Sequence, residues 1–200
     1  MICAVVLAAG LSRRMGAQKL LLPFGGKTVV AHIVDQIIGS AVDKVHVVVG
    51  HEGRRVSWEL SDRPVSVVTN PDYKSGMLSS VRCGLTALSP ECRAVLVALG
   101  DQPSVTSELI DRMVQSFAAT QKQILVPLYD GRRGHPVLFS ANYRDEILTQ
   151  YDDMGLRGLL RAHPEEVFEL SVSSSAVLSD MDCPEDYQRE LALIEKKNAP

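Results

Sequence analysis

Five short apolar runs alternate with segments whose apolar residues recur at helical spacing, and this alternation constrains the fold more than any other feature. The runs cover residues 2–8, 44–49, 65–68, 94–99 and 124–127. A continuously apolar run is typical of a strand that is covered on both faces. Between the runs, apolar stripes predict helices at 29–38, 78–88 and 109–117, the last with Ser107 as its N-cap. The sequence therefore predicts a three-layer α/β/α sandwich with a mostly parallel, Rossmann-like sheet.

The second part of the chain departs from this strict alternation. After residue 130 we expect a short strand around 137–139, helices near 143–148 and 156–162, and a strand at 167–172. An amphipathic helix from Pro184, with Tyr187, Leu191 and Ile194 on one face, is expected to close the chain. The chain has two hundred residues and no repeats or low-complexity segments, so we expect a single domain with a buried core, residues 1–200.

Charge and composition exclude several classes of partner. A net charge of −3 without a basic stripe argues against a nucleic-acid partner. No apolar stretch approaches the roughly 20 residues of a membrane span, and the first eight residues lack the basic start of a signal peptide. The four cysteines show neither a CxxC pair nor metal-ligand spacing. We therefore expect a cytoplasmic protein without disulfides and without a membrane partner.

A loop of small residues and cations directly follows the first apolar run. Ala8 and Gly10 leave room for a ligand to approach the main chain, whose N–H groups bind phosphate oxygens well. Arg14 offers bidentate contacts to phosphate and Lys19 a compact point charge. The loop therefore predicts a polyphosphate site, with a βα turn that is merely basic as the alternative.

Two common phosphate-binding loops are excluded by counting. A P-loop that ends in Gly26-Lys27-Thr28 requires glycine at position 21, where this chain has Leu21. A dinucleotide GxGxxG pattern fails as well, because Ser12 stands two positions after Gly10. A phosphate site in this loop would therefore be of neither of these two types.

Two aspartates are candidate metal ligands. Asp101 follows an apolar run and Gly100, so its carboxylate is expected at the carboxyl end of a strand, where ligands gather in open α/β sheets. A hard oxygen ligand there suits Mg²⁺ on a triphosphate. Asp182 is the candidate second ligand, with Asp180 as its competitor on the same face of an extended segment. The alternative is that one of these two caps the helix that starts at Pro184.

Five segments, in order along the chain, resemble those of the MobA-like nucleotidyltransferases. The loop itself reads LAAGLSRRMGAQKLLLP over residues 7–23. It is followed by SGMLSSVR at 75–82, LGDQP at 99–103, GRRGHP at 131–136 and DMDCPEDY at 180–187. The LAAG of the loop resembles the molybdenum cofactor cytidylyltransferase branch more than the guanylyltransferase branch, which typically has LAGG.

The resemblance implies a fold, a reaction and partners. The fold would be of the nucleotidyltransferase type, with a nucleotide-binding half at 1–103 and an acceptor-binding half with the closing helix at 104–200. The reaction would transfer CMP from CTP, with Mg²⁺, to the phosphate of the molybdopterin form of molybdenum cofactor, releasing pyrophosphate. Such an in-line displacement needs positioning and charge neutralisation rather than a protein nucleophile.

The same resemblance assigns roles to individual residues. Arg14, Lys19 and Asp101 would be catalytic, and Asp101 with Asp182 would hold the metal. The expected nucleotide contacts are Leu7, Ala8, Ala9, Gly10, Ser12, Arg14, Lys19, Ser79, Ser80, Gly100 and Asp101, and the expected acceptor contacts are Arg133, Gly134, His135, Pro136 and Arg157. For the serines the alternative is a helix cap, and for the histidine a structural hydrogen bond.

Two points keep other substrates open. Residues 152–157 read DDMGLR where relatives often have G-D-x-G-A-R, and this segment is expected to face the acceptor. The Cβ of Ala9, where guanine-using relatives typically have glycine, is expected to favour a pyrimidine over a purine. The alternatives are an NTP transferase with another base or acceptor, and a non-catalytic protein that delivers cofactor to a molybdenum hydroxylase apo-enzyme.

Overall fold

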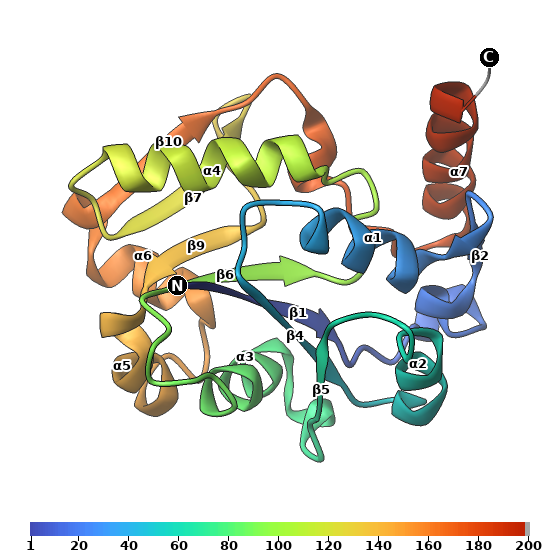
Figure 1. Cartoon of the computed structure of the whole chain (residues 1–200), viewed down its shortest axis with the longest axis horizontal. Coiled ribbons are helices and arrows are strands. Elements are labelled where there is room, and N and C mark those ends of the chain that lie inside the picture. The colour runs from blue at the N-terminus through green and yellow to red at the C-terminus, as the bar shows by residue number, and fades with distance from the viewer. Residues whose placement is uncertain (199–200) are drawn as a thin grey trace.

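A computed structural model describes residues 1–198 of the chain, with side chains up to residue 196. Its main feature is an eight-stranded sheet with the order β10-β7-β9-β6-β1-β4-β5, in which β8 pairs with β7 (Figure 1). The strands of this sheet are β1 (Ile2–Ala8), β4 (Lys44–Val49), β5 (Ser66–Thr69), β6 (Ala94–Leu99), β7 (Ile124–Tyr129), β8 (Arg132–Arg133), β9 (Val137–Ser140) and β10 (Val167–Ser171). A separate two-stranded ribbon consists of β2 (Pro23–Phe24) and β3 (Lys27–Thr28).

Most of the sheet is parallel. β1 pairs in parallel with β4 and β6, β4 with β5, and β7 with β10. β9 runs antiparallel to both of its neighbours, β6 and β7, and β8 turns back antiparallel on β7. The predicted mostly parallel α/β sheet is therefore confirmed.

Helices cover both faces of the sheet. They are α1 (Val29–Ile38), α2 (Gly53–Glu59), α3 (Met77–Thr86), α4 (Ser107–Ala119), α5 (Arg144–Thr149), α6 (Leu156–Ala162) and α7 (Pro184–Asn198). Short 3-10 turns lie at Arg13–Met15, Lys19–Leu21, Tyr73–Ser75, Ala141–Tyr143, Pro164–Glu166 and Ser175–Leu178. No helix among the described residues combines the length and apolar character that crossing a bilayer requires.

Alternate residues of β1 enter two separate cores. Val6 belongs to a core with Ile33 of α1 and Ile110 of α4, whereas Val5 belongs to a core with Leu85 of α3 and Ile147 of α5. This division follows from the two-residue repeat of a strand, which sends neighbouring side chains to opposite faces. The result is the predicted three-layer arrangement.

Helix α7 lies at one end of the molecule beside the β2–β3 ribbon (Figure 1). The predicted apolar face of Tyr187, Leu191 and Ile194 packs against the core that contains α1. The Tyr187 hydroxyl also donates to the carbonyl of Pro23 at 2.7 Å. Through these contacts the end of the chain returns to the segment that follows the opening loop.

The structure corrects one predicted cap and adds elements that the sequence did not reveal. Thr106, not Ser107, is the N-cap of α4, and its hydroxyl accepts from the amide of Leu109 at 3.4 Å. Serine and threonine cap helices by the same chemistry, so the sequence alone did not show which of these two neighbouring residues is the N-cap. Neither α2 nor the β2–β3 ribbon was predicted, because α2 buries only Val56 fully and each strand of the ribbon has only two residues.

An ion-pair cluster ties α1 to the segment after α2. Asp35 accepts from Arg63 Nε at 2.7 Å and from Lys27 Nζ at 2.5 Å. Burial by itself would raise the pKa of Asp35, but these two hydrogen bonds outweigh it and hold the pKa below its ordinary value of 3.8. The stabilisation is therefore present above that value and is lost as the pH falls through the lowered pKa.

We expect Asp35→Asn to lower the free energy of unfolding by about 1–2 kcal/mol at pH 7, because it removes a charge that two cations bind. Urea denaturation at pH 7 and at a series of pH values below 3.8 measures the effect, and the difference from the unmodified protein should shrink as the pH falls. The control is Asp62→Asn, an exposed partner of the same Arg63, which should cost less than about 0.5 kcal/mol. A difference that does not shrink as the pH falls below 3.8 would contradict an ionic origin.

Candidate active site

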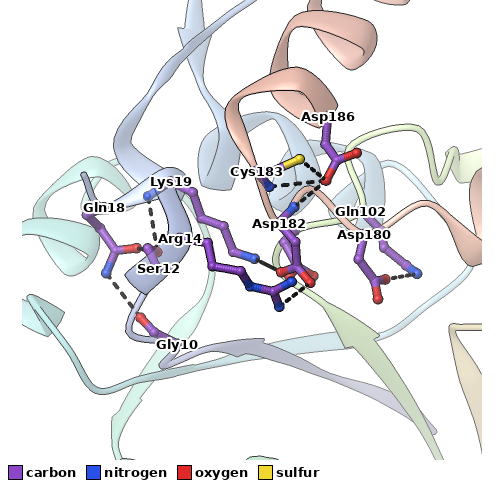
Figure 2. Close-up of polar contacts among 11 residues, drawn as sticks. Gly10, Ser12, Arg14, Gln18, Lys19, Gln102, Asp180, Asp182, Cys183 and Asp186 are labelled. Atoms are coloured by element: carbon purple, nitrogen blue, oxygen red, sulfur yellow. Dashed lines mark hydrogen bonds and ion pairs between the residues drawn. The ribbon is translucent and has the colours of Figure 1, made fainter. Parts of the chain in front are cut away.

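Side-chain hydrogen bonds fix the shape of the loop that follows β1 (Figure 2). The hydroxyl of Ser12 donates to Gln18 Oε1 at 2.7 Å and accepts from the amide of Lys19 at 3.2 Å. The buried Gln18 amide donates in turn to the carbonyls of Gly10 and His51, at 3.4 and 3.1 Å. The phosphate-loop pattern had indicated no role for Gln18, which holds the loop closed from inside.

Lys19 lies between two carboxylates that come from distant parts of the chain. Its Nζ is 2.5 Å from Asp101 Oδ2 and 3.0 Å from Asp182 Oδ1. Arg14 approaches the other oxygen of Asp182 at 2.9 Å. The side chain of Lys19 is only 10% exposed, whereas that of Arg14 is 73% exposed. The structure thus brings together the four predicted catalytic and metal-binding residues.

Gly100 allows Asp101 to reach this position. Its amide donates to the carbonyl of Leu7 at 3.0 Å, and a Cβ at position 100 would lie 2.7 Å from the same oxygen. Only glycine permits such a close approach between the ends of β6 and β1. The close approach places Asp101 beside the opening loop, at the carboxyl ends of the parallel strands.

The electrostatics of this cluster favour additional positive charge. Burial alone would lower the pKa of Lys19, but Asp101 and Asp182 outweigh it, and the pKa is raised above its ordinary value. Burial raises the pKa of Asp101 against the opposing effect of Lys19, and the negative charges of Asp180 and Asp182 add to the rise. Two carboxylates contact the buried ammonium, and the negative charge of nearby Asp180 also acts on Asp101.

The donor set fits Mg²⁺. Among the described residues, no group of three or more His, Cys, Asp or Glu side chains forms a complete metal site. Two carboxylates converge on one cationic group instead, and Mg²⁺ is usually held by one or two carboxylates together with substrate phosphates and water. Asp101 and Asp182 therefore meet the requirement for a metal that a triphosphate brings with it.

Asp180 and Asp182 have different partners in the structure. Asp180 accepts from Gln102 Nε2 at 2.8 Å and lies away from Lys19 (Figure 2). Among the described residues, no side-chain hydrogen bond joins either aspartate to the start of α7. Asp186, in the first turn of α7, instead holds the preceding main chain, because its carboxylate accepts from the amides of Asp182 and Cys183 at 3.0 and 3.1 Å. Of these two aspartates, Asp182 is the one that shares Lys19 with Asp101.

A cavity of about 320 Å³ opens over this cluster. It is lined by Leu7, Gly10, Leu11, Ser12, Arg13, Arg14, Lys19, Leu20, Gly100, Asp101 and Asp182. Ala8 and Ala9 do not line it. Both are buried, and a Cβ at Gly50 would lie 2.9 Å from the methyl group of Ala9. The methyl group of Ala9 therefore packs beside the neighbouring strand end rather than along the cavity wall.

The two predicted nucleotide contacts on α3 lie outside this cavity. The amide of Asn70 donates to the hydroxyls of both Ser79 and Ser80, at 2.9 and 3.0 Å. Ser79 also donates to the carbonyl of Gly76, and Ser80 is buried. These hydroxyls fasten the start of α3 to the end of β5, which is a structural use of both serines.

A second cavity has a volume of about 370 Å³. Its lining residues are Gln102, Arg132, Arg133, Gly134, His135, Val137, Leu156, Arg157, Leu160, Arg161, Val177, Leu178 and Asp180. Four of the five predicted acceptor contacts are among them. The fifth, Pro136, is buried and follows His135 through a cis peptide bond. Arg132 and Arg161 had no assigned role, although Arg132 lies inside the GRRGHP segment.

The main chain around His135 is held tightly against the 175–178 turn. The amide of His135 donates to the carbonyl of Val177 at 2.9 Å, and a Cβ at Gly134 would lie 2.2 Å from that oxygen. Burial lowers the pKa of His135, Asp101 opposes this effect and Arg157 adds to it. His135 is therefore neutral at pH 7 and lies within electrostatic reach of both cavities.

Comparison with known proteins agrees with this arrangement. The MobA-like NTP transferase domain matches residues 4–167. The chain is 31% identical over 198 residues to nicotine blue oxidoreductase of Paenarthrobacter nicotinovorans, covering 95% of this chain and 96% of that protein. It is 25% identical over 187 residues to molybdenum cofactor cytidylyltransferase of Escherichia coli K12, covering 92% of each.

A solved structure extends the comparison to the whole fold. A Mycobacterium tuberculosis H37Rv protein, solved in complex with manganese, is 29% identical with a TM-score of 0.81. The match covers 96% of this chain and 98% of that one. The domain match over most of the chain identifies this protein as a nucleotidyltransferase that belongs to the MobA-like NTP transferase family.

Proposed function

We propose that this protein transfers CMP from CTP to the phosphate of the molybdopterin form of molybdenum cofactor and releases pyrophosphate. The observation that carries the proposal is that residues close together in the chain line two different cavities. Asp101 and Asp182 face the first cavity, while their chain neighbours Gln102 and Asp180 face the second. A nucleotide in one cavity and an acceptor in the other would approach each other near these residues.

In the first cavity, Arg14 and Lys19 neutralise the triphosphate. Asp101 and Asp182 hold Mg²⁺, which supplies further positive charge to the phosphates when bound. Lys19 lies within 3.0 Å of both carboxylates. The group that binds phosphate is therefore next to the groups that bind the metal. This division of roles needs no nucleophile from the protein, because the acceptor phosphate attacks the α-phosphorus itself.

In the second cavity, arginines bind the anionic acceptor. Arg133 is paired with Glu169 at 2.7 Å, which orients it. Within the described part of the chain, Arg132 and Arg157 make no ion pair, so their guanidinium groups can bind a ligand phosphate. The neutral His135 can donate one hydrogen bond without adding charge. Residues 1–103 would thus supply most of the nucleotide site and residues 104–198 most of the acceptor site.

The main alternatives change the substrate or remove catalysis. Another base or another phosphorylated acceptor would use the same two cavities. A non-catalytic protein that delivers cofactor to a molybdenum hydroxylase in the cytoplasm would use only the second. The oxidoreductase name of one relative gains no support from the site, because the two carboxylates and the buried lysine are groups suited to phosphate chemistry.

We expect CTP to be used at least tenfold better than GTP. The LAAG loop resembles that of the cytidylyltransferases and therefore favours CTP. The methyl group of Ala9 packs beside Gly50, so selection between bases would come from the main chain of the loop and not from this methyl group. Pyrophosphate release with CTP, GTP and ATP, each with purified molybdopterin cofactor and Mg²⁺, measures kcat/KM for each nucleotide. Equal or better use of GTP would contradict cytidylyl transfer, and no release with any nucleotide would favour the delivery protein.

A further inference from the structure

Arg82 of α3 binds the end of α5 and the loop that leads to α6. Its Nε donates to the carbonyl of Ile147 at 2.9 Å and its Nη2 to the carbonyl of Gln150 at 2.8 Å. Its Nη1 contacts Asp152 Oδ1 at 2.6 Å. The carbonyls at the end of a helix have no partner within the helix. One guanidinium therefore caps α5 and fixes the start of the following loop.

The loop of residues 150–155 is held in a tight conformation by its own backbone hydrogen bonds. Tyr151 and Gly155 both have positive φ, 75° and 58°, and the amides of Met154 and Gly155 donate to the carbonyl of Tyr151 at 3.1 and 2.8 Å. The Tyr151 ring packs so closely on α6 that a Cβ at Gly158 would lie 2.3 Å from it. Displacement of the loop at its start would therefore shift α6 as well.

Helix α6 forms one wall of the second cavity. Leu156, Arg157, Leu160 and Arg161 line this wall. Arg157 is exposed and close enough to His135 to lower its pKa. Arg157 makes no ion pair among the described residues, so the position of α6 sets where this side chain enters the cavity.

The other end of this connection is the centre of the sheet. α3 packs directly on β1, and a Cβ at Gly84 would lie 2.3 Å from Val5 Cγ1. β1 ends in the loop that carries Lys19. Through α3, Arg82 therefore links β1, which leads into the loop of the first cavity, to the loop before α6, which lines the second cavity.

We propose that Arg82 is a positioning residue for the acceptor cavity, which holds the 150–155 loop and, through it, Arg157. The proposal rests on the proposed function for the identity of the acceptor, but not for the placement of the loop. Arg82 touches neither cavity itself. Its three contacts need the fork of a guanidinium, which lysine does not provide.

The matched control is Arg144, which binds the same pair of helices from the opposite end. Its guanidinium donates to the carbonyls of Thr86 and Leu88, at 3.3 and 3.4 Å, at the end of α3. Arg144→Lys removes the same type of contact as Arg82→Lys, but away from the 150–155 loop. A general loss of helix packing would affect both variants alike.

Hydrogen–deuterium exchange of the full chain tests the placement of the loop without any substrate. We expect Arg82→Lys to speed exchange of the amides of Met154, Gly155 and Gly158 by about tenfold, since hydrogen bonds from a charged donor are lost. Arg144→Lys should leave these amides unchanged. Should Arg82→Lys fail to fold, Asp152→Ala removes the exposed third contact and should speed the same amides by about twofold.

Kinetics tests the consequence for the acceptor. Arg82→Lys should raise KM for the molybdopterin cofactor about tenfold, with KM for CTP and the dissociation constant of CTP unchanged, and Arg144→Lys should change neither KM. Unchanged exchange of the loop, or faster exchange with an unchanged acceptor KM, would overturn the proposal. A parent protein that transfers nothing to the cofactor refutes the proposed function instead, and the exchange result still decides whether Arg82 places the loop.

Discussion

Asp101→Asn should reduce pyrophosphate release by about a thousandfold, because the variant loses one of two charged ligands for Mg²⁺ and with it several kcal/mol of transition-state stabilisation. Asparagine has nearly the same shape, so hydrogen bonds to the side chain can remain. The carboxylate of Asp101 is held beside Lys19 and has a raised pKa because it is buried among other acids. Lys19 keeps Asp182 as a charged partner at 3.0 Å, and position 101 lies at a strand end rather than in the core, so the fold should be retained.

A binding measurement separates the loss of metal from the loss of chemistry. Titration with Mn²⁺ in the presence of CTP, followed by electron paramagnetic resonance, should show weaker metal binding in Asp101→Asn. Asp180→Asn is the matched control, since Asp180 lies in the same acidic group but binds Gln102 instead of Lys19. It should retain metal affinity. Ordinary turnover by a folded Asp101→Asn protein would refute the metal assignment.

Replacing Lys19 should lower kcat by about 10²–10³, equivalent to roughly 2.7–4 kcal/mol, by analogy with the loss of one donor from an oxyanion hole. Because its side chain is only 10% exposed, Lys19→Met is a better variant than Lys19→Ala, which would leave a cavity. Methionine keeps the length of the chain and removes the charge. The loss should appear in kcat more than in KM, since the charge on the phosphates grows in the transition state.

The same substitution predicts a distinctive metal dependence. Without the ammonium, Asp101 and Asp182 lose their shared cation, so the Mg²⁺ concentration for half-maximal rate should not rise. Lys27→Met is the control, because Lys27 also binds an aspartate but lies outside both cavities. Its rate should stay within about twofold of the parent. A less than fivefold loss in Lys19→Met would mean that Lys19 serves only to neutralise the two carboxylates.

Much of the fold could be predicted from the local pattern of the sequence. Consecutive apolar residues at 2–8 and 94–99 mark buried strands because both faces of a central parallel strand are covered. The helices of residues 29–38 and 109–117 follow from apolar spacing, and so does the apolar face of the closing helix. The position of Asp101 at a strand end also follows, since Gly100 ends an apolar run. These features depend on neighbours within a few residues.

What the sequence could not provide are contacts between distant segments. Residues 180 and 182 have the same local surroundings, yet only Asp182 reaches Lys19, because Gln102 binds Asp180 and Asp186 holds the main chain at 182. Likewise, motif likeness placed Ser79 near the nucleotide, whereas its hydroxyl is bonded to Asn70 in the structure. Whether these serines contact nucleotide stays a prediction.

The sequence by itself determined the layered α/β fold and the presence of a loop of small residues and cations, because both depend on short-range periodicity and residue type. The tertiary structure alone decided which charges meet. Lys19 lies 82 residues from Asp101 and 163 from Asp182 along the chain, and only the packing of β1 against β6 and the return of the chain end at α7 bring them within 3.0 Å. Side-chain charge acts over a few ångströms through space, whatever the separation along the chain.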